Sequence, residues 1–349
     1  MTLDKLPPFT ICCTRITAVG TRPMDQILTL AGQNLLSPVI LCFVLGLAAA
    51  LARSDLTFPE AIAKGMSLYL LFSIGFKGGA SVAEHGADLR LGLAVLVGVV
   101  LSLILPFVAY ALLRGLSRGI SATDAAAVAG HYGSISIVTF VAISSLLQAR
   151  GISIEGYMVA VAAAMEAPAI VSALWLATRS GGGGKITPDL WHEILLNGSI
   201  VLLLGAFIIG WITGERGLAE IAPLIVTPFK GVLCLFLLDM GIVAGRGLRN
   251  ARGIITPGVL AFGVLMPLVG ATFGALAGLA LGLSVGGLAV MMALTASASY
   301  IAVPAAMRVA LPRANPALYL TLALAITFPF NLTLGIPLFM ALASTLAGG

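Results

Sequence analysis

Long apolar runs recur along the whole chain, and they decide what this sequence can fold into. Most are about 18 to 25 residues long, the length that an α-helix needs to cross about 30 Å of hydrocarbon. Of the 349 residues, 59% are hydrophobic and only 9% are charged, whereas soluble domains carry about 25% charged residues. No aqueous fold could bury so much apolar surface. The sequence therefore predicts an all-α polytopic membrane protein that is surrounded by the lipid bilayer.

Hydropathy and helix breakers together predict about ten transmembrane helices. A glycine run between Arg179 and Lys185, typical of a flexible linker, divides these helices five and five. The expected spans lie at 36–52, 58–76, 91–113, 121–148, 157–177, 194–213, 222–245, 255–282, 284–311 and 317–346. The segments are then a poorly ordered N-terminal extension at 1–30, a first five-helix repeat at 31–178, a Gly-rich cytoplasmic linker at 179–190 and a second five-helix repeat at 191–349.

Basic residues in the loops predict the orientation in the membrane. Alternate loops lie on the same side, and basic residues are concentrated in one set, which we place in the cytoplasm. That set holds Arg53, Arg114, Arg118, Arg179, Lys185, Arg246, Arg249, Arg252, Arg308 and Arg313, and the other holds Lys77, Arg90, Arg150 and Arg216. Both termini are then extracytoplasmic in the inner (plasma) membrane. Topology accounts for the net charge of +5, so no nucleic-acid partner is expected.

The two halves also resemble each other in sequence. Ser134 and Ser136 occupy the same place in the fourth span as Ser297 and Ser299 in the ninth, and proline recurs in the fifth and tenth spans. Because each half has an odd number of spans, the second copy is inverted relative to the first. Inverted repeats are typical of secondary transporters.

The fourth and ninth spans contain residues that weaken a helix at mid-depth, so both helices are expected to be discontinuous. Broken helices in a membrane are tolerated where the freed backbone groups line a cavity or bind a ligand. Half-helix N-termini attract anions, while freed carbonyls and hydroxyls suit Na⁺. The predicted substrate-binding residues are Gly133, Ser134, Ser136, Thr139, Ser297, Ala298, Ser299 and Tyr300.

Helix packing is the alternative explanation of these serine-rich stretches, because small residues let helices approach and a hydroxyl can bond back to its own helix. Their occurrence in two corresponding spans favours a binding site. His131 could contact a substrate, but a single histidine is more often a packing residue.

An acidic residue in the middle of the fifth span, Glu166, is the second indication of function. An ionisable group at that depth is costly unless it is paired or hydrated, so it marks a functional site by default. Glu166 could bind Na⁺ or exchange a proton. The predicted ion-coupling residues are Glu166, Asp239, Asn331 and Thr295, and the candidate Na⁺ ligands among the named residues are Ser136, Glu166 and Ser299.

At these residues the chain resembles the SbtA-type sodium-dependent bicarbonate transporter family. The strongest stretches are 130–139, 164–173 and 312–316, together with 336–339. The resemblance implies inverted five-helix repeats with a core and a gate domain, a homotrimer, a bicarbonate and Na⁺ site where spans four and nine cross, and a PII-like cytoplasmic regulator. It places the hydroxyl-rich break on Ser134, Ser136 and Thr139, and the acidic residue before proline on Glu166. The chain departs from the family pattern at Tyr300.

The sequence thus predicts a secondary active transporter that imports bicarbonate with Na⁺ as the coupling ion and no other cofactor. One alternative keeps this architecture but carries another small organic anion, coupled to Na⁺ or H⁺. Another is a channel-like or receptor membrane protein that does not transport. An enzyme is not expected, because the chain shows no Ser-His-Asp set, paired aspartates or metal-binding motif.

Overall fold

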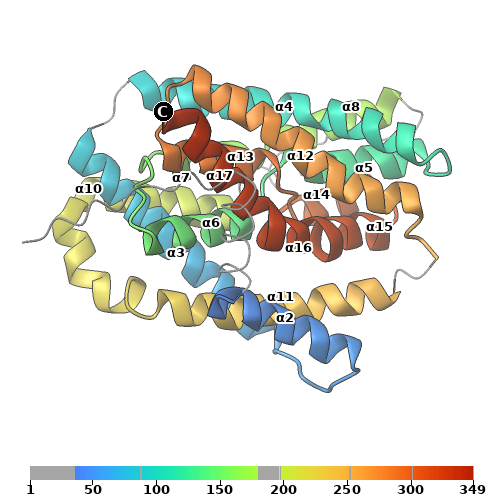
Figure 1. Cartoon of the computed structure of the whole chain (residues 1–349), viewed down its shortest axis with the longest axis horizontal. Coiled ribbons are helices and arrows are strands. Elements are labelled where there is room, and N and C mark those ends of the chain that lie inside the picture. The colour runs from blue at the N-terminus through green and yellow to red at the C-terminus, as the bar shows by residue number, and fades with distance from the viewer. Residues whose placement is uncertain are drawn as a thin grey trace, which may run out of the picture.

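The computed structural model describes residues 36–86, 89–179, 196, 198–250, 253–300 and 302–348. Within these ranges all regular secondary structure is helical (Figure 1). Eight helical segments among them are long and apolar enough to cross a membrane, and two further apolar helices are shorter. This confirms an all-α, multi-pass membrane protein. The predicted extension at 1–30 and most of the predicted linker at 179–190 lie outside the described residues.

The first half of the chain forms seven helices among the described residues, since two of its spans are interrupted. They are α2 (Pro38–Leu51), α3 (Glu60–His85), α4 (Leu89–Leu116), α5 (Ala122–Gly133), α6 (Ile137–Ala149), α7 (Met158–Ala164) and α8 (Pro168–Arg179).

The second half also contains an interrupted span, formed by α13 and α14, but its last span at 316–347 is helical throughout and includes π-helical turns. Its elements are α10 (Gly198–Ile225), α11 (Phe229–Asn250), α12 (Pro257–Ala280), α13 (Val285–Thr295), α14 (Ala302–Ala310), α15 (Pro316–Leu320), the π-helical turn η1 (Thr321–Thr327), α16 (Phe328–Phe330), the π-helical turn η2 (Asn331–Gly335) and α17 (Ile336–Ala347).

Two loops expected from the sequence are helical in the structure. Helix α3 continues nine residues past the predicted end of the second span at 76, to His85, so Lys77 lies inside a helix and not in a loop. Helix α10 bends at Gly214, where φ is 60°, and then continues through Arg216. Arg216 forms an exposed ion pair with Glu220 at 3.5 Å. Glycine allows the sharp bend because positive φ costs it little, and hydropathy alone does not reveal a helix that continues beyond its apolar part.

Helices α2, α3, α10 and α11 form one layer of the molecule, and α11 lies alongside α2 at one edge (Figure 1). In this layer α10 packs along α3, and α11 packs along α2. The approach of α2 and α11 depends on a pair of glycines. A Cβ atom at Gly46 would collide with the Leu238 carbonyl oxygen, and one at Gly241 would collide with the Phe43 carbonyl oxygen. Small residues at such contacts are typical of helix packing in membranes.

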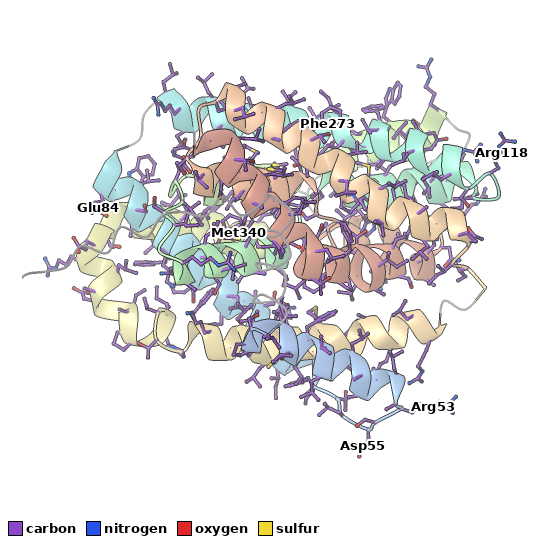
Figure 2. The ribbon with its side chains drawn as sticks, in the orientation of Figure 1. Arg53, Asp55, Glu84, Arg118, Phe273 and Met340 are labelled. Carbon is purple, nitrogen blue, oxygen red and sulfur yellow. The ribbon has the colours of Figure 1, made fainter. Side chains whose placement is uncertain are left out.

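The remaining helices form a bundle in which α5, α6 and α13 are the innermost. The most apolar stretch of the span formed by α5 and α6 lies wholly inside the protein, whereas only 33% of the corresponding stretch of α4 does. Charged side chains such as Arg53, Arg118 and Glu84 lie at the edges of the molecule, while Met340 is buried within it (Figure 2). The interrupted helices are thus shielded from lipid, which is where a membrane protein tolerates irregular backbone.

Candidate functional site

Two helix breaks meet in the centre of the bundle. One separates α5 from α6, and the other separates α13 from α14. Both fall where the sequence contains the paired serines. The described residues of the two breaks are 134–136 and 296–300, and together we call them the crossing.

Hydrogen bonds join the two breaks directly. The Ser299 N–H donates to the His131 carbonyl at 2.8 Å, and the His131 Nδ1 bonds the Ser299 carbonyl in return. The Ser136 N–H donates to the Ser297 Oγ at 2.8 Å. These pairs are 161 to 168 residues apart in the sequence. The crossing therefore ties the two halves of the chain together.

Serine side chains explain why each break is stable. Ser136 has extended backbone and caps α6, because its Oγ accepts the Thr139 N–H at 3.2 Å. Serine is a preferred residue at this position. In the second break the Ser297 hydroxyl donates to the Leu294 carbonyl at 2.8 Å while it accepts the Ser136 N–H. One serine thus satisfies a freed carbonyl of α13 and a freed N–H before α6.

The tenth span contributes two polar side chains through its π-helical turns. The Asn331 amide donates to the Ala296 carbonyl at 2.8 Å, which satisfies another freed group of the crossing. The Thr327 hydroxyl donates to the Gly263 carbonyl at 2.7 Å and lies 2.6 Å from the Tyr132 hydroxyl. Because the single Thr327 proton goes to Gly263, Tyr132 must be the donor to Thr327. These bonds fix the last span against the crossing.

Several polar atoms at or near the crossing are buried and have no hydrogen-bond partner among the described residues. An unpaired buried polar group costs about 1 to 3 kcal/mol, so each of these atoms is a candidate contact for a polar ligand. The atoms are His131 Nε2, Ser134 Oγ, Thr139 Oγ1, Glu166 Oε2, Tyr300 Oη and Asn331 Oδ1.

His131, which the sequence analysis treated as more often a packing residue, connects the two breaks. It is fully buried, and its ring stacks on Tyr319 with centroids 4.6 Å apart. A carbonyl can only accept, so the bond to Ser299 requires a proton on Nδ1 and leaves Nε2 as an acceptor in the neutral ring. Its position between two glycines, in the stretch Gly130 to Gly133, was the only signal in the sequence, because its partner lies 168 residues away.

Glu166 lies at a third interruption, between α7 and α8, that was not foreseen. The Ser102 hydroxyl of α4 bridges this interruption, since it donates to the Met165 carbonyl at 2.7 Å and accepts the Ala169 N–H at 3.1 Å. Glu166 is 4% exposed. The end of α5 packs nearby, because a Cβ at Gly133 would come within 2.9 Å of the Ala169 Cβ. Pro168, the first residue of α8, was the signal for this break.

Four predicted site residues have other surroundings. Gly133 packs against Pro106 of α4, where a side chain would not fit, and Ala298 belongs to the apolar core. The Thr295 hydroxyl donates back to the Met291 and Met292 carbonyls at 2.9 and 3.1 Å. Asp239 lies on α11, and no hydrogen bond among the described residues connects it to the crossing.

Tyr300 and Ser299 complete the crossing on the side of the ninth span. The Tyr300 ring packs edge-on against Phe328, with centroids 5.6 Å apart. Its hydroxyl lies close to the Ser136 side chain but has no hydrogen bond within the described part of the protein. Ser299 is 2% exposed and is held by its backbone contacts to His131. The joint Na⁺ site at Ser136, Glu166 and Ser299 stays a prediction.

A bundle of membrane helices in which two broken helices meet at a buried polar centre is an arrangement that secondary transporters commonly have. The chain belongs to the Na⁺-dependent bicarbonate transporter superfamily, whose family model matches residues 38–344. A comparison with curated proteins gave no match. The family resemblance inferred from the sequence is thereby confirmed, and the matched segment includes both breaks and Glu166.

Proposed function

We propose that this protein is a secondary active transporter that imports bicarbonate together with Na⁺. The observation that carries the proposal is the crossing, where hydrogen bonds hold two broken helices together while nearby buried polar atoms have no partner in the described part of the chain. Membership in the bicarbonate transporter superfamily supports the substrate, and it favours transport over catalysis.

The chemistry of the crossing suits bicarbonate better than a simple halide. Bicarbonate accepts hydrogen bonds through its oxygens and donates one through its O–H group. The hydroxyls of Ser134, Thr139 and Tyr300 can donate, and His131 Nε2 and Asn331 Oδ1 can accept. The N-terminus of α6 adds a positive dipole end beside Ser136. A site that uses hydroxyls and dipoles can release its anion more readily than one that uses a buried arginine.

Coupling to a cation follows from Glu166. This carboxyl is buried beside an interrupted helix, and no ion pair to it is present among the described residues. A Na⁺ ion bound to its oxygens would offset the charge at a depth where an unpaired carboxylate is costly. A proton would do the same, so an H⁺-coupled carrier of another small organic anion is the second candidate. The dependence of uptake on Na⁺ or on pH distinguishes the two.

An arrangement of ten spans in two inverted repeats accounts for the helix contacts. In this scheme the eight longer helical segments are eight of the ten spans. The other two are α2 and the interrupted span of α13 and α14. The first span α2 packs on the seventh, α11, and the sixth span α10 packs on the second, α3. Likewise α4 packs on α5 as α12 packs on α13. A two-fold axis in the membrane plane that exchanged the two halves would convert the α2–α11 contact into the α10–α3 contact, and the α4–α5 contact into the α12–α13 contact. The matching contacts therefore support an inverted repeat.

In this proposal α2, α3, α10 and α11 form the gate domain, and the other helices form the core domain that contains the crossing. The homotrimer, the PII-like cytoplasmic regulator and the placement of both termini outside the cytoplasm are further parts of the proposal. The first two rest on the family resemblance, and the orientation rests on the loop charges.

The direct test is uptake of radiolabelled bicarbonate into proteoliposomes that contain the purified protein. An inward Na⁺ gradient is expected to stimulate uptake, and an ionophore that dissipates the gradient is expected to remove the stimulation. Saturation with bicarbonate concentration separates a carrier from a channel. Uptake that is indifferent to Na⁺ but follows a proton gradient would replace the proposal with the second candidate.

A further inference from the structure

A cavity of about 590 Å³ is lined by residues of α3 and α6 and by none of the crossing. Its lining on α6 includes Phe140, Ser144 and Gln148, which follow one another at intervals of four residues. Residues at this spacing share one face of a helix, and Ser136 begins the same face. The cavity therefore extends along α6 from exposed Gln148 toward the crossing, and its innermost α6 residue is one turn, about 6 Å, from Ser136.

Lys77 lines this cavity from the side of α3. It lies inside the membrane-spanning segment Glu60–Glu84, about 10 Å from the end of that segment at 1.5 Å per residue. Its Nζ lies 4.5 Å from the ring centroid of Phe229, and no carboxylate is paired with it among the described residues. A cation within a membrane span normally faces a hydrated cavity and marks an ion pathway.

Lys77 is not the only charged residue that lines the cavity. Arg90 also lines it, and Glu155 is its one carboxylate among the described residues. The Glu155 Oε1 accepts the Ser284 N–H at 2.7 Å, and Ser284 caps the start of α13. The carboxylate thus interacts with the positive end of the α13 dipole. Buried Ser144 Oγ has no hydrogen-bond partner in the described chain and can serve a bound ligand.

We propose that this cavity is a second anion-binding site, in which Lys77 attracts a small monovalent anion before it reaches the crossing. The proposal rests on the proposed function only for the identity and direction of the transported anion. The loop charges place Lys77 and Arg90 on the extracytoplasmic side, which is where an imported anion would enter. The cavity is much larger than the about 30 Å³ share of one water molecule, so the anion can be bound with part of its hydration shell.

The test measures the electrostatic field in the cavity without any transport. A reporter thiol is introduced as Ser144→Cys in protein whose native cysteines are replaced by serine, namely Cys12, Cys13, Cys42 and Cys234. Its reaction rates with a negatively charged methanethiosulfonate reagent and with the positively charged analogue are compared in detergent. We expect the anionic reagent to react faster, and we expect Lys77→Gln to lower the ratio of the two rates on the order of 10-fold.

Lys64→Gln is the matched control, because Lys64 is an exposed lysine of the same helix that does not line the cavity. It should leave the rate ratio unchanged, and Lys77→Arg should preserve it. In the reporter protein with Lys77 intact, raising the salt to about 1 M should also reduce the ratio, since the Debye length is then about 3 Å. This salt measurement does not require the Lys77 variants to fold.

An unreactive thiol at position 144, or a rate ratio that is the same with and without the Lys77 charge and insensitive to salt, overturns the proposal. In proteoliposomes Lys77→Gln should raise KM for the anion with little change in kcat, because it weakens capture and leaves the crossing intact. If bicarbonate is not the substrate, uptake fails in every variant while the labelling ratio still responds to Lys77. Failure of this inference and failure of the proposed function are therefore distinguishable.

Discussion

At the scale of single residues, the direction in which a side chain faces separates binding from packing. Thr139 and Thr295 are both buried threonines in the interrupted spans. The Thr139 hydroxyl has no partner among the described residues, whereas the Thr295 hydroxyl is bonded to its own helix. Composition singled out both residues. The difference between their hydroxyl groups depends on tertiary contacts, which cannot be predicted from residue types and spacing.

Thr139→Val and Thr295→Val form a matched pair that tests this difference. Valine keeps the shape of threonine and removes only the hydroxyl. At position 139 we expect KM for bicarbonate to rise about 5- to 150-fold, which corresponds to the loss of one buried polar partner at about 1 to 3 kcal/mol. At position 295 we expect a change in melting temperature with a nearly normal KM. Uptake kinetics and thermal melting of both variants distinguish binding from packing. If Thr139→Val leaves KM unchanged, Thr139 is not part of the site.

Glu166→Gln tests the coupling residue. The substitution is nearly isosteric and removes only the charge and the proton site, so the protein should fold and melt normally. We expect Na⁺-stimulated uptake to fall at least about 10-fold, because one strong cation contact is worth about 1.4 kcal/mol or more. Ser102, which bridges the nearby interruption, is unchanged and preserves the local backbone. Retention of full Na⁺ stimulation would assign Glu166 a packing role.

At the scale of helices, the sequence predicted the long apolar elements well and their ends less well. Hydropathy predicted about ten spans, and eight helical segments among the described residues are long and apolar enough to cross a membrane. The extension of α3 to His85 and the bend of α10 at Gly214 were missed, because polar residues continue a helix when neighbouring helices support it. The interruption at Glu166 was missed for a similar reason, since a serine of another helix stabilises it. The bond between Asn331 and Ala296 likewise depends on the tertiary fold.

Gly241→Ala and Gly231→Ala compare two glycines of α11. A Cβ atom at position 241 would collide with the Phe43 carbonyl oxygen of α2, whereas a Cβ atom at position 231 would have no atom of another described helix within 4 Å. We expect Gly241→Ala to destabilise the protein by about 1 to 3 kcal/mol through overpacking. Gly231→Ala should be neutral or slightly stabilising, because alanine favours a helix. Thermal melting of the two purified variants provides the comparison, and equal melting temperatures would contradict the close α2–α11 contact.

At the scale of the whole molecule, the contacts between the halves indicate how a transporter of this kind operates. The crossing is held by hydrogen bonds within the bundle, and the layer of α2, α3, α10 and α11 packs beside it. In the proposed function, alternating access requires the bundle to move against this layer while the site remains intact. The class of protein could be predicted from the sequence, because apolar runs of membrane-spanning length recur along the chain and two corresponding spans contain helix-breaking residues. The cavity beside Lys77 could not, because α3 and α6 meet only in the folded protein.

Labelling of single cysteines tests the orientation that the loop charges predict. A cysteine introduced in the glycine run at 181–184 should react only with reagents that reach the cytoplasm, because the basic loops lie on that side. A cysteine in the extension at 1–30 should react from outside intact cells. The native cysteines are replaced beforehand, and permeabilised cells show that each introduced thiol is reactive. Labelling of the 181–184 cysteine from outside alone would invert the assigned orientation.

In the proposed function the movements of Na⁺ and bicarbonate are coupled, and the reverse experiment measures this coupling. Proteoliposomes with equal Na⁺ inside and outside receive an inward bicarbonate gradient, and uptake of radiolabelled Na⁺ is measured at constant pH with the membrane potential clamped. Because coupling is reciprocal, we predict that Na⁺ accumulates transiently inside the proteoliposomes although its concentrations are equal at the start. Glu166→Gln is predicted to abolish this accumulation. Na⁺ movement that is the same with and without the bicarbonate gradient would contradict Na⁺-coupled bicarbonate transport.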